Sequence, residues 1–355
     1  MDFRKKTVRD IDIAGKTVLV RVDYNVPIKD GKIADDMRIR ASLPTLQYLI
    51  EQGAGKIIVI SHLGRPDGKP MPEFSLMPVA KHLGELLPGH TVRFINETTG
   101  DDVKMAVENL PQTGILVLEN LRFSPGEEEN SDDFANAIIS DTGAEIFVQD
   151  GFAVIHRAHA STEAIAKKIP AVAGFLVEKE VTSLESAMVN PERPLLVIIG
   201  GAKVEDKQPL IDKFLPIADE IAIGGKIAAD GYRPYDDKIY VAEDFVTDEN
   251  GAKLDISKED AAIIMIKVLA AKTVIWNGTL GMVEDPRYAK ASQAVARTIG
   301  SHDCFSIIGG GDTTGFVDSL HGENLKFSLV STGGGASLEL LSGKTLPGLE
   351  VLQDR

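Results

Sequence analysis

The sequence contains little of what several classes of protein require. Cys304 is the only cysteine in 355 residues, so an intrachain disulfide is impossible and a metal site built on cysteines is excluded. No apolar run approaches the roughly 18 residues that span a bilayer, and residues 1–6 lack the apolar core of a signal peptide. The 53 Asp and Glu residues outnumber the 38 Lys and Arg residues, and the formal charge of −15 argues against nucleic-acid binding. We therefore expect a soluble, cytoplasmic protein that binds neither a membrane nor nucleic acid.

The chain is long enough for two domains, each with its own core. Residues 194–207 predict a buried strand at 195–199, a tight turn at Gly200 and Gly201, and then a helix. If the segment after Gly201 is helical, Lys203 and Lys207 share one face and could cradle a phosphate beside the helix N-terminus. For this stretch alone, an ordinary turn with solvated lysines is an equally good interpretation.

Four predicted strands in the first half end in basic or polar residues. Each basic residue taken alone is more often a solvated surface charge, but four similar strand ends in an acidic protein favour an anionic substrate. Alternating strands and helices predict a parallel sheet whose ligands bind at the carboxyl ends of the strands, so these residues should converge there. They are Arg21, Arg38, His62, Arg65, Arg122, His156, Arg157 and His159.

Five predicted strands in the second half end in glycine, at residues 200–201, 224–225, 278, 309–311 and 333–335. Repeated glycines at carboxyl strand ends favour a polyphosphate held by backbone amides. Asp312 is predicted at a helix start, where its carboxylate could bind Mg²⁺, cap the helix, or do both. The fold class predicted from these patterns is α/β, with two doubly wound, Rossmann-like parallel-sheet domains.

Several motifs resemble those of the phosphoglycerate kinase family. They are RVDYNVP (21–27), SHLGRP (61–66), ENLRF (119–123), HRAH (156–159), GGAK (200–203), WNG (276–278), GGGDT (309–313) and STGGGASLELL (331–341). The resemblance covers nearly the whole chain. It implies a monomeric glycolytic enzyme that transfers a phosphoryl group reversibly between 1,3-bisphosphoglycerate and ADP, giving 3-phosphoglycerate and ATP with Mg²⁺.

The resemblance also implies the domains and the site residues. Residues 1–172 would bind 3-phosphoglycerate, 173–188 would form a hinge helix, 189–340 would bind the nucleotide, and the tail 341–355 would pack back on the first domain. The implied substrate residues are Asp23, Tyr24, Asn25, Arg38, His62, Leu63, Gly64, Arg65, Arg122 and Arg157. The implied nucleotide residues are Lys207, Gly224, Asn277, Glu284, Gly310, Gly311, Asp312 and Thr313, with Asp312 on Mg²⁺. The implied catalytic residues are Arg38, Lys203, Gly311 and Gly334, acting after domain closure.

The sequence departs from the family pattern in residues 149–156, at Lys226, at 255–260 and after Gly278. The chain between Gly225 and Asp255 is also shorter than in family members, so we expect an intact phosphate-binding site and a reduced pocket for the base. Two alternatives stay open at this point. One is a related protein that binds phosphorylated metabolites without turnover, and the other is a kinase for a different small carboxylate.

Overall fold

The computed structural model describes residues 3–320 and 322–355. The chain divides into two compact units. The N-terminal unit runs as far as Val181 and also includes Thr345–Arg355, and the C-terminal unit comprises Thr182–Lys344. No helix among the described residues is long and apolar enough to cross a membrane.

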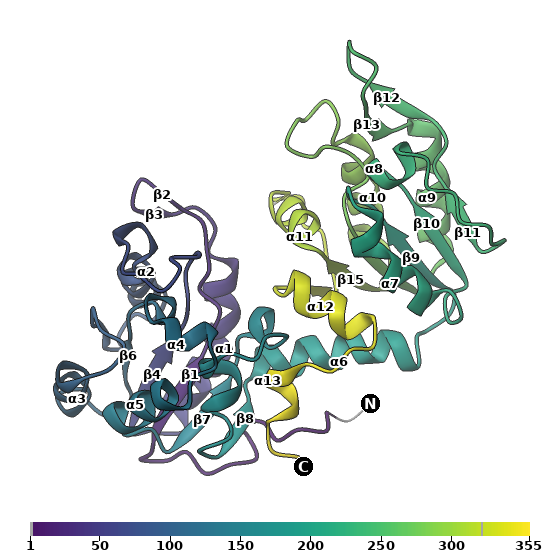
Figure 1. The fold of residues 1–355 in the computed structure, drawn as a ribbon. Helices are drawn as coiled ribbons and strands as arrows, with labels where there is room; N and C mark the ends of the chain where they lie inside the picture. The colour runs from purple at the N-terminus through teal and green to yellow at the C-terminus, as the bar shows by residue number, and fades with distance from the viewer. Residues whose placement is uncertain (1–2, 321) are drawn as a thin grey trace. The chain divides into compact units, whose positions relative to one another are not determined.

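The N-terminal unit is built on a six-stranded sheet in the order β5-β6-β4-β1-β7-β8 (Figure 1). Every pairing in this sheet is parallel, as the alternating pattern predicts. The strands are β1 (Thr17–Arg21), β4 (Lys56–Ile60), β5 (Val92–Phe94), β6 (Gly114–Val117), β7 (Ile146–Gln149) and β8 (Ala171–Ala173). A separate hairpin joins β2 (Ile28–Lys29) to β3 (Lys32–Ile33).

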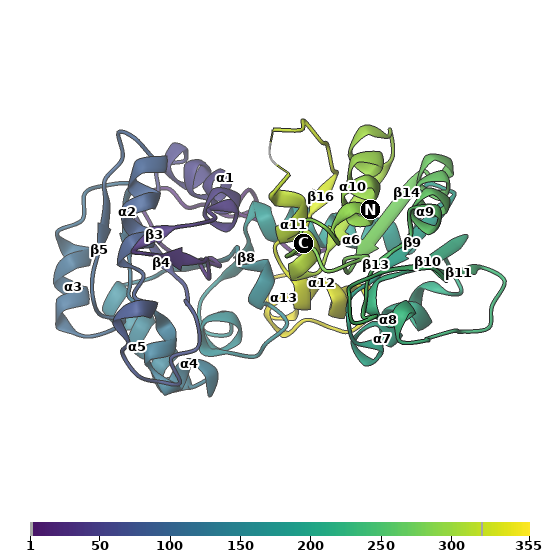
Figure 2. The ribbon, with the colours of Figure 1, turned by 90° about the horizontal axis from the view of Figure 1, so that it is seen from above.

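Helices cover both faces of this sheet (Figure 2). Successive strand residues point to opposite faces, so Val18 and Val20 pack in one core with Leu46 of α1 and Val79 of α2, whereas Leu19 faces the other side. The helices are α1 (Met37–Glu51), α2 (Met77–Leu86), α3 (Asp101–Glu108), α4 (Pro125–Glu128) and α5 (Asp132–Thr142). Short helical turns are η1 (Pro72–Phe74), η2 (Leu121–Phe123), η3 (Phe152–Val154) and η4 (Ala160–Ala164).

The C-terminal unit contains a second six-stranded sheet, in the order β11-β10-β9-β14-β15-β16. Its pairings are also all parallel, and the predicted strand 195–199 is confirmed as β9, with all five residues buried. The strands are β9 (Leu195–Ile199), β10 (Glu220–Ile223), β11 (Ile239–Val241), β14 (Thr273–Asn277), β15 (Phe305–Gly309) and β16 (Leu329–Val330). An antiparallel hairpin, β12 (Phe245–Thr247) with β13 (Lys253–Ile256), stands apart from the sheet.

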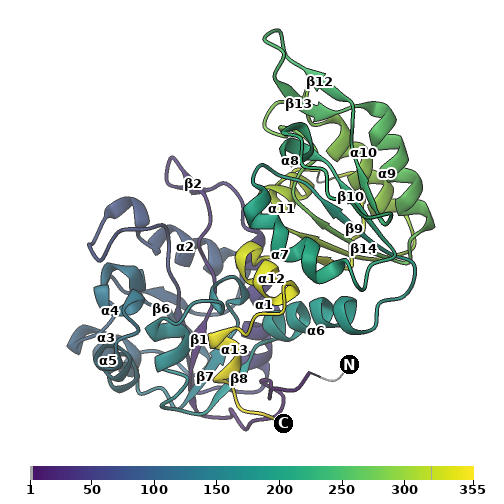
Figure 3. The same ribbon diagram turned by 45° about the vertical axis from the view of Figure 1, so that its right-hand side comes forward.

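Helices again lie on both faces, with α9 packed on α10 on one side and α7 packed on α12 on the other (Figure 3). They are α7 (Val204–Phe214), α8 (Gly225–Ala229), α9 (Lys258–Ala270), α10 (Lys290–Ser301), α11 (Gly311–Asp318) and α12 (Gly334–Leu341). The two doubly wound, Rossmann-like sheets predicted from the sequence are therefore confirmed.

Helix α6 (Phe175–Val189) is continuous across the boundary between the units, and the single helix predicted here is confirmed. Asp150, at the end of β7, accepts the backbone N–H of Leu176 at 2.9 Å and so caps the start of α6. The last residues, including α13 (Pro347–Glu350), belong to the N-terminal unit, where the Gly348 N–H donates to Ile155 O at 2.8 Å and Gln353 pairs with Ala171. The role of α6 as a hinge stays a prediction.

Candidate active site

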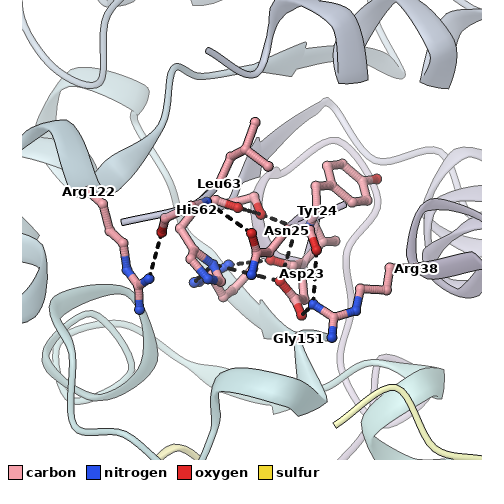
Figure 4. Close-up of polar contacts among 12 residues, drawn as sticks. Asp23, Tyr24, Asn25, Arg38, His62, Leu63, Arg122 and Gly151 are labelled. Carbon is pink, nitrogen blue, oxygen red and sulfur yellow. Dashed lines mark hydrogen bonds and ion pairs between the residues drawn. The ribbon is translucent and has the colours of Figure 1, made fainter. Parts of the chain in front are cut away.

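The carboxyl edge of the N-terminal sheet gathers the polar residues that follow its strands (Figure 4). Arg38, in the first turn of α1, donates to Asp23 Oδ2 at 2.7 Å and to the Asn25 carbonyl at 3.1 Å. Asp23 is buried and follows β1, and its Oδ1 accepts the N–H of Asn25 at 3.1 Å. The buried carboxylate therefore fixes the direction of a half-exposed arginine.

Hydrogen bonds of Gly64 hold the loop after β4 beside the Asp23–Arg38 pair. Gly64 donates its N–H to Asn25 Oδ1 at 2.9 Å, and its carbonyl accepts from Arg122 Nη1 at 2.9 Å. The φ of Gly64 is +64°, and a Cβ there would lie 2.3 Å from the ring of Phe74. Only glycine therefore allows this turn.

The Arg122 guanidinium is buried at this edge with part of its hydrogen-bonding capacity unsatisfied by the described residues. Its side chain is 3% exposed, and within the described part of the chain Nε and Nη2 are buried without a hydrogen-bond acceptor. Nε lies 3.1 Å from Glu128 Oε1 as an ion pair, although the pair does not have hydrogen-bond geometry. Buried polar groups are normally satisfied, so two unsatisfied guanidinium nitrogens indicate an anion-binding site, in which a phosphate or a carboxylate could accept from both nitrogens.

The remaining predicted substrate residues differ in how they are placed. Arg65 is exposed on the loop after β4, and Arg157 is half-buried beside His156, to whose Nε2 its Nε donates at 3.2 Å. Tyr24 and Leu63 are buried in the hydrophobic core of the unit, and the Tyr24 hydroxyl bonds Ser42 Oγ at 2.8 Å. Their side chains are part of the core, so only their backbones can serve a ligand at this edge.

Burial and the neighbouring arginines together keep the two buried histidines neutral. Burial lowers the pKa of His62 well below its usual 6.5, and the positive charges of Arg21 and Arg122 lower it further. Burial also lowers the pKa of His159 to about 4, again with help from Arg122 and Arg21. Both rings are therefore neutral at physiological pH and add no positive charge to that of the arginines.

Three buried residues of this edge are not among the site residues that the family resemblance implies. Arg21 was noted as a strand-end residue, but Ser161 and Glu127 escaped because they lie in polar segments with no periodic signal. Arg21 Nε donates to Ser161 Oγ at 2.7 Å, and Ser161 Oγ donates to Glu127 Oε1 at 2.6 Å. Residues 149–156, which depart from the family pattern, retain the parallel strand β7 beside them.

The carboxyl edge of the C-terminal sheet is formed by three glycine loops in close backbone contact. A Cβ on Gly200 would lie 2.2 Å from Thr279 O, and one on Gly278, whose φ is +99°, would lie 2.2 Å from Gly200 O. The amides of Gly200 and Gly201 donate to Asn277 O and Thr279 O at 3.0 and 2.9 Å. The expectation that glycine amides hold phosphate is therefore wrong for Gly200 and Gly201, whose amides already bond carbonyls at and after the end of β14, and it stays a prediction for the other glycine loops.

The two lysines after β9 are not on one helical face, contrary to the sequence-based expectation. Helix α7 begins at Val204, and Lys203 precedes it in extended conformation with φ of −121°. Lys207 lies in the helix, and its Nζ donates to Asn277 Oδ1 at 2.5 Å. Burial lowers the pKa of Lys207, while the carboxylates of Asp206 and Asp312 act in the opposite direction. Asn277 Nδ2 is buried without a partner among the described residues.

The free amides of this edge belong to two other helices. Gly310, with φ of +88°, is the N-cap of α11, so Asp312 lies in the first turn rather than at the cap. Gly334 opens α12, and a Cβ on it would lie 3.1 Å from Gly311 N. The starts of two helices therefore meet, and the first amides of each have no intrahelical acceptor. Thr313 Oγ1 accepts the Gly278 N–H at 2.8 Å and ties α11 to β14.

A cavity of about 230 Å³ opens between these loops and the β12–β13 hairpin. Its polar wall includes Glu284 and Asp312, and its apolar wall includes Phe245, Leu280 and Met282, which were not predicted. The full lining is Gly201, Ala202, Gly225, Lys226, Ala229, Phe245, Lys253, Leu254, Asp255, Thr279, Leu280, Gly281, Met282, Glu284 and Asp312. Gly224 is the N-cap of α8. Lys226, which lines the cavity, pairs with Asp230 at 2.7 Å. Within residues 225–255, Phe245 and Leu254 thus contribute apolar surface to the cavity, and the reduced base pocket stays a prediction.

Comparison with known proteins identifies the family of the chain. The family model described as phosphoglycerate kinase matches residues 8–233 and 235–344. The structure of phosphoglycerate kinase from Coxiella burnetii is 31% identical, with a TM-score of 0.80 over 98% of each chain. The crystal structure of phosphoglycerate kinase from Pyrococcus horikoshii is 28% identical, with a TM-score of 0.87 over 98% of each chain. A match of this extent, on a fold with an arginine-rich edge in one unit and a glycine-rich edge in the other, shows that the chain belongs to the phosphoglycerate kinase family.

Proposed function

We propose that the protein is a phosphotransferase with a carboxyl group as acceptor, which transfers a phosphoryl group reversibly between 1,3-bisphosphoglycerate and ADP. The observation that carries the substrate assignment is the buried Arg122 guanidinium, two of whose nitrogens lack an acceptor among the described residues. A phosphate monoester offers three strong acceptor oxygens, which suits such a site better than an uncharged ligand does. 3-Phosphoglycerate is the acceptor substrate in this reaction.

On the substrate side, Arg122, Arg65 and Arg157 bind the anionic ends of 3-phosphoglycerate, and Asn25 and His62 orient it. Asp23 has a supporting role, because its carboxylate holds Arg38 rather than a ligand anion. Arg38 is 28% exposed, and the buried Asp23 carboxylate holds its guanidinium at the carboxyl edge of the sheet. We assign it to the phosphoryl group during transfer.

On the nucleotide side, the residues fit a nucleotide with its Mg²⁺. The cavity combines an apolar wall with the Asp312 carboxylate, and Asn277 Nδ2 is an unpartnered donor close to Lys207 among the described residues. Asp312 would hold Mg²⁺ together with phosphate oxygens, and the metal would neutralise phosphate charge when bound. Lys207, Asn277 and Thr313 line the phosphate end, and Gly224 and Glu284 lie toward the rest of the nucleotide.

The amides of Gly311 and Gly334 and the side chains of Lys203 and Arg38 are the groups that we assign to catalysis. Fixed donors that face the place where negative charge develops lower the barrier without reorganisation. The meeting of two helix starts at Gly311 and Gly334 supports this assignment, since each start carries partial positive charge.

The decisive experiment measures turnover with 3-phosphoglycerate and MgATP, coupled to glyceraldehyde-3-phosphate dehydrogenase. We expect activity that is lost in Arg122→Met and retained in Arg40→Met, because Arg40 is an exposed arginine of α1 that pairs with Asp36. Calorimetry with 3-phosphoglycerate and with MgADP accompanies the assay. Binding of both ligands without turnover would identify a binding protein. Failure to bind 3-phosphoglycerate, with another small carboxylate accepted instead, would identify a kinase for a different substrate.

A further inference from the structure

Arg21 is an unusual feature of the N-terminal unit, because it is a charged residue only 1% exposed and is not among the substrate residues that the family resemblance implies. Three of its nitrogens have defined partners. Nε donates to Ser161 Oγ at 2.7 Å, Nη1 donates to the Val22 carbonyl, and Nη2 lies 3.3 Å from His62 Nδ1. A buried charge with this many fixed contacts cannot rotate freely.

Glu127 balances that charge through Ser161. Its side chain is fully buried, and its two oxygens accept the hydroxyl and the backbone N–H of Ser161 at 2.6 and 3.0 Å. The Ser161 hydroxyl has one hydrogen, which it gives to Glu127, so its oxygen lone pair is turned toward Arg21. Glu127, Ser161, Arg21 and His62 therefore form one directed chain of hydrogen bonds.

The direction of these hydrogen bonds determines which nitrogen of the His62 ring carries the proton. A guanidinium has donors only and stays protonated, so the ring nitrogen that faces Arg21 must accept. The competing partner of Nδ1 is Asp23 Oδ1, which lies at 3.7 Å, beyond hydrogen-bond distance, and already accepts the Asn25 N–H. With Nδ1 accepting, the single proton of the neutral ring must be on Nε2.

We propose that Glu127, Ser161 and Arg21 are positioning residues, which hold His62 as a neutral Nε2–H donor for an anionic oxygen of the bound substrate. The site thereby gains a neutral hydrogen-bond donor in addition to the positively charged donors of the arginines. The identity of the substrate rests on the proposed function, whereas the state of the His62 ring does not.

The first test examines the ligand-free full-length protein by nuclear magnetic resonance with ¹⁵N-labelled histidine. The seven histidines give separate ring signals, and His62→Gln identifies the one of interest. The charged groups that face His62 are Arg21 at the end of β1, Asp23 just after it, Arg38 from α1, Arg122 from η2 and Arg157. We expect a ring protonated only at Nε2 between about pH 6 and pH 8. A ring protonated at Nδ1, or a charged ring in that range, would overturn the proposal.

The second test breaks the chain at Ser161. Ser161→Ala should give a mixture of ring forms at His62 and weaken 3-phosphoglycerate binding about tenfold in calorimetry, and Ser161→Thr, which keeps the hydroxyl, should restore both. The matched control is Thr142→Val, which removes a buried hydroxyl that bonds Ile138 O at 2.6 Å in α5, outside the chain.

A merely structural role for Ser161 would lower stability in Ser161→Ala and in Thr142→Val alike and leave the ring form unchanged, which would refute the proposal. Wild-type protein with the expected ring form but no affinity for 3-phosphoglycerate would contradict the proposed function and leave the positioning role standing.

Discussion

Replacing Arg122 with methionine should damage function and stabilise the fold at the same time. Arg122 is 3% exposed, carries two buried nitrogens without acceptors among the described residues, and pairs with a half-exposed Glu128. Removing one partner of a buried ion pair is usually destabilising because the other charge stays buried, but Glu128 is 47% exposed and can be hydrated. Relief of the desolvation penalty of the unsatisfied donors, about 1–3 kcal/mol, should therefore dominate. The bond to Gly64 O would be lost, at about 1 kcal/mol. The net expectation is a gain of about 1 kcal/mol, or roughly 2–4 °C in Tm.

The effect on substrate should have the opposite sign. Two charge-assisted hydrogen bonds to a phosphate contribute about 1.5–3 kcal/mol each, so losing both should raise the Kd for 3-phosphoglycerate at least about a hundredfold. The affinity for MgADP should stay unchanged, since the nucleotide cavity belongs to the other unit.

Differential scanning calorimetry without ligands measures the stability change, and titration calorimetry measures the two affinities. Trp276 is the only tryptophan and is buried in β14, so its fluorescence reports unfolding of the C-terminal unit and serves as an internal control. Two separate units need not unfold in one step. A destabilised Arg122→Met variant that binds 3-phosphoglycerate normally would show that the guanidinium is structural and that the unsatisfied nitrogens have no anion to bind.

Three further predictions follow from the site and from the cap of α6. Arg38→Ala and Lys203→Ala should each lower kcat by about a hundredfold or more, because they remove positive charge at the transferred group, and an unchanged kcat in both would show a wrong assignment. kcat/KM for ATP, GTP and ITP should differ by less than about a hundredfold, since the 225–255 segment is short, and a strong ATP preference would refute that interpretation. Burial raises the pKa of Asp150 from 3.8 to about 8, so its contribution to stability is fully present below pH 3.8 and is lost as the pH rises toward 8. Asp150→Asn, which keeps an acceptor for the Leu176 N–H, should therefore become progressively more stable than wild type over that range in urea unfolding, and parallel stability curves would contradict this.

The sequence by itself determined the sheets and the edge at which ligands bind. Residues 195–199 and 57–60 are continuously apolar, as is typical of a parallel strand buried on both faces, and they lie in β9 and β4. Because parallel strands all end at one edge, the polar residues after each strand had to converge. That is why Arg21, His62 and Arg122 could be placed at one edge from the chain alone.

Only the tertiary structure decided which groups at that edge are free and which are already bonded. The Gly201 N–H donates to Thr279 O, whereas the first backbone N–H groups of α11 and α12 have no intrahelical acceptor. Likewise, Glu127 and Arg21 lie 106 residues apart in the chain and meet through Ser161. A sequence pattern records which groups are present in one segment, but hydrogen bonds are made between segments, and their partners are set by the packing of the whole unit.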